Sequence, residues 1–337
     1  MESAVKRIGV LTSGGDAPGM NAAVRAVVRT AVGENVECVG IRRGWNGLIN
    51  NDFEVMNGSS VSNIINKGGT ILYTARSEEF KTREGRDKAL GTCKLLGLDG
   101  IVAIGGDGTF RGALALSRQA AAEGHTLQVV GIPGTIDNDI GCSHYTIGFD
   151  TACNTAVECI DRLRDTMQSH ERCSVVEVMG REAGYLALYV GISVGATAVL
   201  IPERPVDFEN DVADNIRRAR LAGATHYMVV VAEGAGSAYD IAARIHDDLG
   251  IEPRVTVLGH IQRGGSPSAR DRETASRMGY EAVKVLSEGK GNRVIATQDG
   301  RIVDLDMEEA LQMTKTLEME RYQVLEALTN SRRPAEL

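Results

Sequence analysis

The sequence predicts an α/β protein of three layers, helix–sheet–helix, with mainly parallel sheets and two similar lobes. Short apolar runs alternate with segments of helical period, which is the pattern of layered α/β folds. Several of these runs are apolar throughout, as expected of parallel strands that are buried on both faces. The chain has 337 residues, and single cores rarely grow beyond about 250–300 residues, so two lobes are favoured.

Apolar runs bounded by polar or glycine-rich segments define the strands. Eight strands are predicted, at 7–12, 36–41, 100–104, 128–132, 174–179, 197–201, 226–232 and 254–258. Amphipathic helices fill the intervals, most clearly at 20–32 and at 151–169, where Val157, Ile160, Leu163 and Met167 recur at spacings of three and four. Near the C-terminus, runs at 294–297 and 302–305 flank Asp299–Gly300 and predict a hairpin, followed by one last helix.

The polar loop IGCSHYT separates two strand–helix runs and places a lobe boundary near residue 140. We therefore expect a first lobe over residues 1–140 and a second over residues 141–302. The C-terminal segment 303–337 is expected to be able to join the first lobe.

The amino-acid composition argues against nucleic acid and membranes as binding partners of this protein. Acidic residues outnumber basic ones 45 to 37, for a net charge of −8, whereas proteins that bind nucleic acid are usually basic, so no nucleic-acid partner is expected. No apolar run approaches the ~18 residues of a membrane-spanning helix, and the start MESAVKRIGVL lacks a signal-peptide pattern. The six cysteines include no CxxC pair and are expected to be reduced thiols. We expect a cytoplasmic protein without a membrane partner.

The first predicted strand leads into a glycine-rich loop, LTSGGDAPGMN. Gly14 and Gly15 allow close approach of a phosphate to the backbone and to the start of the next helix. The loop is no Walker A motif, since it lacks the lysine, and no GxGxxG motif; Arg42 follows the second strand where an acidic residue would bind an NAD ribose. A glycine turn needed only for its geometry remains the alternative.

Two further loops follow buried strands, GGDGT at 105–109 and PGTIDND at 133–139. Ligands of α/β sheets collect at such strand ends. Asp107 can hold Mg²⁺ beside phosphate oxygens. If the second loop is extended, Thr135, Asp137 and Asp139 share one face, and a carboxylate there can accept a proton from an attacking hydroxyl. The combination favours phosphoryl transfer, with an Asx-turn as the structural alternative for one aspartate.

These loops, together with DTMQSHER at 165–172, EVMGR and VLGHIQRGGSP, resemble the bacterial ATP-dependent 6-phosphofructokinases in the family's own order. The resemblance runs from about Arg7 to the region of Ile302. HIQRGGSP and PGTIDND together are specific to this family, whereas GGDGT alone also fits NAD kinases and some lipid kinases.

The resemblance implies ATP-dependent phosphorylation of fructose 6-phosphate to fructose 1,6-bisphosphate in glycolysis, by in-line transfer with Mg²⁺. The first lobe would bind ATP and the second the sugar phosphate. It implies that Asp137 is the base, with Thr135 beside it, and that Asp107 serves the metal. The implied ATP-binding residues are Gly14, Arg76, Ser77, Gly106, Asp107, Gly108 and Thr109. Those implied around fructose 6-phosphate are Thr135, Asp137, Met179, Gly180, Arg181, Glu233, His260 and Arg263, with Arg181 also near the transferring phosphoryl group.

The family pattern further implies a homotetramer in which Arg172 and Arg254 reach the active site of a neighbouring subunit. In the family pattern, pyrophosphate-dependent members have GGDD in the first of these loops and PKTIDND in the second. This chain has Gly108 in place of that second aspartate and Gly134 in place of the lysine. Two glycines leave room for the larger nucleotide, so the resemblance favours ATP as the donor.

Arg25, Arg29 and Arg164 match positions of an effector site for ADP or phosphoenolpyruvate. Asn63 and Ala224–Thr225 replace an aspartate and lysines that are common in the family, so we expect catalysis without the usual allosteric response. A catalytically inactive regulatory subunit on the same fold is the alternative of a different class, although Asp107, Asp137 and Arg181 are all present.

Overall fold

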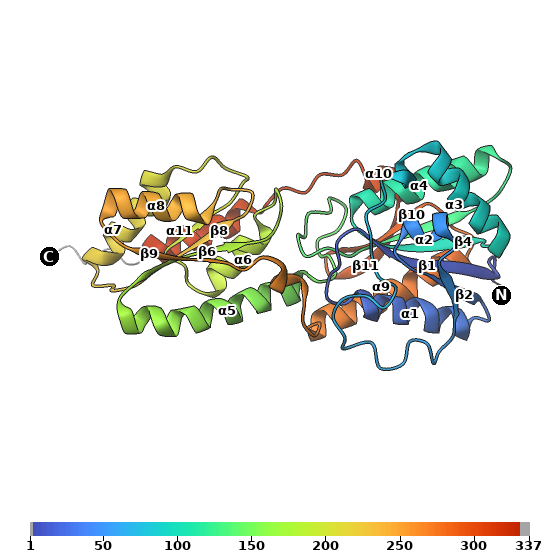
Figure 1. Cartoon of the computed structure of the whole chain (residues 1–337), viewed down its shortest axis with the longest axis horizontal. Helices are drawn as coiled ribbons and strands as arrows, with labels where there is room; N and C mark the ends of the chain where they lie inside the picture. The colour runs from blue at the N-terminus through green and yellow to red at the C-terminus, as the bar shows by residue number, and fades with distance from the viewer. Residues whose placement is uncertain (1–2, 331–337) are drawn as a thin grey trace. The chain divides into compact units, whose positions relative to one another are not determined.

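The computed structural model describes residues 3–330 and divides the chain into two compact units (Figure 1). The first unit contains residues 3–136, Ile140–Thr151 and Arg263–Lys315. The second contains Asp137–Asp139, Ala152–Gln262 and, of the described residues, 316–330. Each unit is built on its own sheet, which confirms the predicted α/β class.

The first unit contains a seven-stranded sheet in the order β11-β10-β5-β4-β1-β2-β3. Its strands are β1 (Arg7–Ser13), β2 (Glu37–Ile41), β3 (Phe53–Met56), β4 (Gly100–Gly105), β5 (Gln128–Pro133), β10 (Arg293–Gln298) and β11 (Arg301–Asp306). The five central strands pair in parallel, while β3 and β11 pair antiparallel at the two edges. Every residue of β4 is buried, as expected for a strand covered on both faces.

Helices cover both faces of this sheet (Figure 1). They are α1 (Met20–Gly33), α2 (Trp45–Asn50), α3 (Arg83–Leu96), α4 (Asp107–Ala122), α9 (Ala269–Ser287) and α10 (Met307–Ala310), with a 3₁₀ turn at Glu79–Lys81. Buried side chains of α2, α3, α4 and α10 form one hydrophobic cluster with the strands, while α1 and α9 pack together on the other face. Gly279 permits that close packing, because a Cβ there would lie 2.7 Å from the Cβ of Ala26.

The second unit contains a four-stranded parallel sheet in the order β7-β8-β6-β9. Its strands are β6 (Cys173–Val178), β7 (Ala198–Leu200), β8 (Tyr227–Ala232) and β9 (Pro253–Val257). Its helices are α5 (Phe149–His170), which begins in the first unit, α6 (Tyr185–Ser193), α7 (Asp214–Leu221), α8 (Ala238–Leu249) and α11 (Met319–Asn330), with a π-helical turn at Glu209–Ala213 and a 3₁₀ turn at Gly259–Arg263. Buried residues of α7 and α8 pack on one face of the sheet.

All eight predicted strands and the C-terminal hairpin are present, with ends shifted by a few residues. The division into units differs from the expected boundaries near 140 and 302. The chain returns to the first unit at Arg263, because α9 packs on α1 and β10 joins β5. The expected C-terminal segment is also divided, since β11 and α10 lie in the first unit and α11 in the second; residues 331–337 lie outside the described residues.

Within the described residues, no helix combines the length and the apolar character that crossing a membrane would require.

Candidate active site

Three of the predicted loops begin side by side at the carboxyl edge of the larger sheet. Ser13 at the end of β1 is in register with Gly105 at the end of β4, and Gly105 is in register with Pro133 at the end of β5. The Thr109 hydroxyl donates to the carbonyl oxygen of Ser13 at 3.1 Å, and the Gly134 amide donates to that of Gly105 at 3.0 Å. The structure therefore brings the three loops together, as their strand-end positions predict.

The GGDGT loop passes directly into α4, which begins at Asp107. Gly106 precedes the helix, so the positive end of α4 lies at this loop, which favours an anion there. Among the residues that the structure describes, no atom lies within 4 Å of a Cβ built on Gly108, and Gly108 is exposed. This loop therefore has the open space and the positive helix end that suit a phosphate chain.

The first glycine loop is held in a left-handed conformation at Gly14, with φ of 92°, and the Thr74 hydroxyl donates to the Gly14 carbonyl at 2.7 Å. The guanidinium of Arg263 covers this loop. Its Nη1 donates to the carbonyl oxygen of Asp16 at 3.0 Å and would lie 2.6 Å from a Cβ on Gly15. Arg263 thus belongs to the first unit, although the resemblance groups it with the sugar-phosphate residues.

An aromatic pair supports the segment that carries Arg76 and Ser77. The Ser77 hydroxyl accepts from the Phe80 amide at 3.2 Å, and the Phe80 ring stacks on that of Trp45 with centroids 4.5 Å apart. Both rings are buried, whereas Arg76 is exposed. The guanidinium of Arg76 can therefore meet a ligand while the segment beneath it is anchored.

The PGTIDND loop does not continue as an extended strand. It turns at Ile136–Asp137, and Asn138 has a left-handed φ of 53°. The expected alternation of Thr135, Asp137 and Asp139 on one face is therefore wrong, because alternation requires extended backbone. Thr135 lies in the first unit, while the two aspartates group with the second.

The Asp137 carboxylate is buried, with 1% of the side chain exposed, and its Oδ2 lies 3.3 Å from Nε of Arg181. The Arg181 side chain is 54% exposed, so its guanidinium reaches from solvent to a buried carboxylate. Arg181 itself has a left-handed φ of 54°, a conformation that costs free energy in a non-glycine residue and that clusters at functional sites. A carboxylate in this position can accept a proton from an attacking hydroxyl, and a cation beside it can stabilise charge on a transferring group.

Glu233 supports the strained loop that carries Gly180 and Arg181. It follows β8, and its Oε1 accepts hydrogen bonds from the amides of Gly180 at 3.1 Å and Arg181 at 2.7 Å. The carboxylate of Glu233, predicted to contact the sugar, therefore also fixes the backbone of the MGR loop that follows β6. Met179 is half-buried on the same loop.

Replacing Glu233 by alanine is expected to reduce the hydrogen-exchange protection of the Gly180 and Arg181 amides. Hydrogen bonds to a charged acceptor stabilise by roughly 1.5–3 kcal/mol each, so protection should fall by about tenfold or more. Glutamine keeps an acceptor oxygen and should retain most of the protection. Amide exchange measured by NMR on the two variants tests this, and equal protection in the alanine variant would contradict the supporting role.

The remaining basic site residues predicted in the second unit lie at two ends of its sheet. His260 lies in the turn that follows β9, at the same carboxyl edge as Met179, Arg181 and Glu233. Arg172 directly precedes β6, and Arg254 is in register with Ser174 near the start of the same strand. At ~3.3 Å per residue along β6, Arg254, which is level with Ser174, lies about 16 Å from the level of Met179, and Arg172 lies about 23 Å from it.

The predicted effector residues come from separate units. Arg25 and Arg29 lie one turn apart on α1 in the first unit. Arg164 lies on α5 in the second unit, where its guanidinium donates to the carbonyl oxygen of Val194 at the end of α6. Asn63 is exposed.

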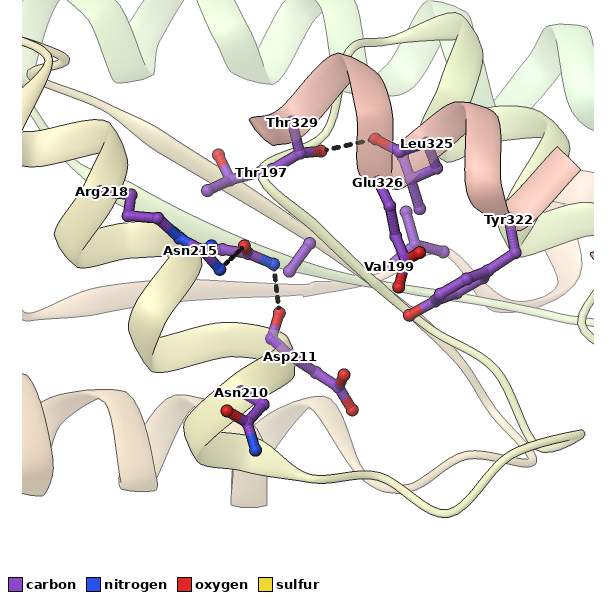
Figure 2. Close-up of a pocket in the computed structure, with 11 residues that line it drawn as sticks. Thr197, Val199, Asn210, Asp211, Asn215, Arg218, Tyr322, Leu325, Glu326 and Thr329 are labelled. Atoms are coloured by element: carbon purple, nitrogen blue, oxygen red, sulfur yellow. Dashed lines mark hydrogen bonds between the residues drawn. The ribbon is translucent and has the colours of Figure 1, made fainter. Parts of the chain in front are cut away.

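A polar pocket in the second unit is separate from these residues (Figure 2). It lies beside β7 and is lined by the π-helical turn, α7 and α11, including Asp211, Asn215, Arg218, Tyr322 and Glu326. None of the predicted site residues lines it.

The family model described as phosphofructokinase matches residues 7–286. The chain is 50% identical over 325 residues to the ATP-dependent 6-phosphofructokinase of Clostridium botulinum, covering 96% of this chain and 100% of that protein. The same enzyme of Clostridium acetobutylicum is 51% identical over the same shares of both chains.

Solved structures agree. The phosphofructokinase of Saccharomyces cerevisiae superposes with a TM-score of 0.87 at 34% identity, over 97% of this chain and 47% of that one, so this chain spans about half the yeast chain. A pyrophosphate-dependent phosphofructokinase from Marinobacter aquaeolei has a TM-score of 0.85 at 20% identity, over 98% and 92% of the two chains, which shows a shared fold. The resemblance seen in the sequence is confirmed: the chain belongs to the phosphofructokinase family.

Proposed function

We propose that this protein transfers the γ-phosphoryl group of ATP to the 1-hydroxyl of fructose 6-phosphate, in cytoplasmic glycolysis. The observation that carries the proposal is the buried Asp137 carboxylate beside Arg181, in a chain that is 50% identical to ATP-dependent 6-phosphofructokinases. The 1-hydroxyl oxygen attacks phosphorus and its proton passes to Asp137. The new O–P bond forms as the bond to the ADP oxygen breaks, so ADP leaves with that electron pair.

Arg181 stabilises charge on the transferring group. Its guanidinium is largely exposed on a loop whose backbone Glu233 holds, so it can contact phosphoryl oxygens without leaving Asp137. Positioning and charge stabilisation supply most of the catalysis in phosphoryl transfer, because the transition state needs little covalent help. We assign the contacts with the sugar to Met179, Gly180, Glu233 and His260. Thr135 is assigned to the substrate beside Asp137, and Arg263 to the sugar phosphate.

ATP is assigned to the carboxyl edge of the larger sheet in the first unit. Gly14, Gly106, Gly108 and Thr109 lie there on adjacent strand ends, and Arg76 and Ser77 lie on the segment anchored by Trp45 and Phe80. The open space at Gly108 supports a nucleotide donor, since an aspartate there would add bulk and negative charge to the phosphate loop.

Asp107 suits Mg²⁺. Its carboxylate is a hard oxygen donor in the first turn of α4, and its negative charge, after burial, contributes to raising the pKa of the nearby Cys142 thiol to about 11. Among the described residues there is no cluster of three or more His, Cys, Asp or Glu side chains that could hold a metal. Mg²⁺ in proteins is commonly held by one or two carboxylates together with phosphate oxygens and water, so Asp107 would be a sufficient protein ligand. When bound, the ion neutralises charge on the β- and γ-phosphates.

Arg172 and Arg254 are assigned to the 6-phosphate in the active site of a second copy, within a homotetramer. Both lie at the amino edge of the smaller sheet, whereas the other sugar residues of this unit lie at its carboxyl edge. A separation of about 16 Å or more along β6 is too long for one arginine side chain to bridge, which supports sharing of sites between subunits.

Initial rates with fructose 6-phosphate and Mg²⁺, compared between ATP and pyrophosphate as donors, test the function. Rapid turnover with ATP and little with pyrophosphate is expected, because Gly108 and Gly134 replace the two charged residues of the pyrophosphate pattern. The opposite preference would retain the family and overturn the donor assignment. No turnover with either donor would favour the regulatory subunit instead.

A further inference from the structure

Asp271 is a buried acidic residue outside the site described above. It lies in the first turn of α9 and its side chain has no exposed surface. Its carboxylate accepts hydrogen bonds from the backbone amides of Gly148 at 2.7 Å and Thr151 at 2.9 Å, and from the hydroxyls of Tyr145 and Thr151. Burial raises the pKa of this carboxyl group, and the same hydrogen bonds oppose the rise.

The carboxylate lies at the start of two helices. Gly148 and Thr151 flank the beginning of α5, so Asp271 caps α5 while occupying the first turn of its own helix, α9. Ser268 completes the junction, since its hydroxyl accepts from the Asp271 amide at 3.2 Å and its amide donates to the Thr151 hydroxyl at 2.9 Å. A negative charge at two positive helix ends is favourable, and it fixes segment 145–151 against α9.

Segment 145–151 in turn holds the loop that leads into Asp137. The Ile147 amide donates to the carbonyl oxygen of Pro133 at 3.0 Å, and Gly134 and Ile147 form a parallel bridge. The Thr146 hydroxyl donates to the carbonyl oxygen of Thr135 at 2.6 Å. Residues 133–135 of the loop are therefore held by Thr146 and Ile147, and the residues that follow these two, Gly148 and Thr151, are hydrogen-bonded to Asp271.

The same segment has little room to move on its other side. A Cβ on Gly19 would lie 2.6 Å from Cγ2 of Ile147 and 3.4 Å from the Cβ of Asp271. Gly148 adopts a φ of 104°, and a Cβ there would lie 2.6 Å from that of Ala17. Residues 145–151 are thus packed against the segment that connects the first glycine loop to α1.

We propose that Asp271 is a positioning residue for phosphoryl transfer, which fixes segment 145–151 and through it the 133–135 loop that presents Thr135 and leads into Asp137. This inference rests on the proposed function, because that function gives the loop its chemical role. Asp271 does not touch the reacting atoms; it acts through four hydrogen bonds and the main chain.

The substitution Asp271→Asn tests whether the hydrogen bonds that the carboxylate accepts, and not only the space that the side chain fills, hold segment 145–151 in place. Asparagine has nearly the same size as aspartate, but one of the two acceptor oxygens becomes an NH₂ donor. The hydroxyls of Tyr145 and Thr151 can rotate to accept from that group, whereas the amides of Gly148 and Thr151 cannot reverse. One backbone N–H must then face another donor, so segment 145–151 has to shift.

The test compares Asp271→Asn with Thr92→Val, which removes a buried hydroxyl that donates to the carbonyl oxygen of Leu48 in α2. Kinetics per folded protein and hydrogen exchange of residues 133–151 are measured for both. Asp271→Asn should lower kcat by about 10–100-fold, because misplacing reacting groups by ~1 Å can cost that much. The same variant should leave KM for ATP nearly unchanged and should raise the rate of hydrogen exchange in residues 133–151. Thr92→Val should neither lower kcat nor raise this exchange.

A second pair of variants, at Thr151, tests the same role if the Asp271→Asn protein does not fold. Thr151→Ala should lower kcat and raise exchange, and Thr151→Ser, which keeps the hydroxyl, should restore both. Unchanged kcat or unchanged exchange in well-folded Asp271→Asn, or equal defects in the alanine and serine variants, would overturn the positioning role. Absence of turnover in the wild-type protein would instead overturn the proposed function, while the exchange comparison would still decide whether Asp271 fixes the loop.

Discussion

Replacement of Asp137 by asparagine is expected to lower kcat by about 10²–10⁴-fold, the contribution typical of a general base. The amide cannot take the proton from the 1-hydroxyl of fructose 6-phosphate, although it fills the same space. KM for the sugar phosphate should change much less, because the contacts assigned to Arg181, Glu233 and His260 remain. Steady-state kinetics over a range of sugar phosphate concentrations measure both quantities.

Thermal unfolding separates lost chemistry from lost structure. The Asp137 carboxylate is 1% exposed, so removing its charge also removes the cost of burying it, and the variant should melt no lower than the wild-type protein. Asp240→Asn, an exposed carboxylate in the first turn of α8, serves as the matched control and should leave kcat unchanged. A fully active Asp137→Asn protein would show that another group accepts the proton.

The parts of the fold that the sequence predicts well are those governed by local pattern. Strands such as β4 and β5 are buried runs between turn residues, and their ends place GGDGT and PGTIDND without further information. Register between adjacent parallel strands then brings Gly105 and Pro133 together. The fold class and these loops therefore follow from apolar runs and glycine positions.

The turn within PGTIDND depends on contacts made far along the chain. Two aspartates in alternation suggest extended backbone, but Asn138 adopts a left-handed φ and the chain turns at Ile136–Asp137. Segment 145–151 holds the start of this loop, and Asp271, 120 residues beyond Thr151, holds that segment. Nothing in the local sequence of PGTIDND carries that information.

Other features could have been found only in part. Ser268 and Asp271 have the S-x-x-D spacing of a helix start, which marks the beginning of α9 but not the second helix that Asp271 caps. The Trp45–Phe80 stack joins α2 to a 3₁₀ turn 35 residues away, and a single tryptophan in a sequence gives no sign of its partner. The return of the chain to the first unit at Arg263 likewise depends on α9 packing against α1.

The assignment of Arg254 to the 6-phosphate of the sugar predicts a large change in KM when this residue is replaced. Replacing Arg254 by alanine removes a charge-assisted contact to the 6-phosphate, worth roughly 1.5–3 kcal/mol. This corresponds to a rise of about 10–100-fold in the KM for fructose 6-phosphate. Arg277→Ala, which removes an exposed arginine paired with Glu273 on α9, is the matched control and should leave this KM unchanged.

Mixing Arg254→Ala with Asp137→Asn subunits then tests whether sites are shared. A site on an Arg254→Ala subunit keeps its own Asp137 and receives an intact Arg254 from its neighbour, whereas the reciprocal site lacks both. With random pairing across a two-fold interface, roughly a quarter of all sites should regain wild-type kinetics. Demonstrably mixed oligomers that regain no low-KM activity would place Arg254 outside the neighbouring site. Recovery would require a second copy, because Arg254 and the sugar residues of its own unit lie about 16 Å apart along β6.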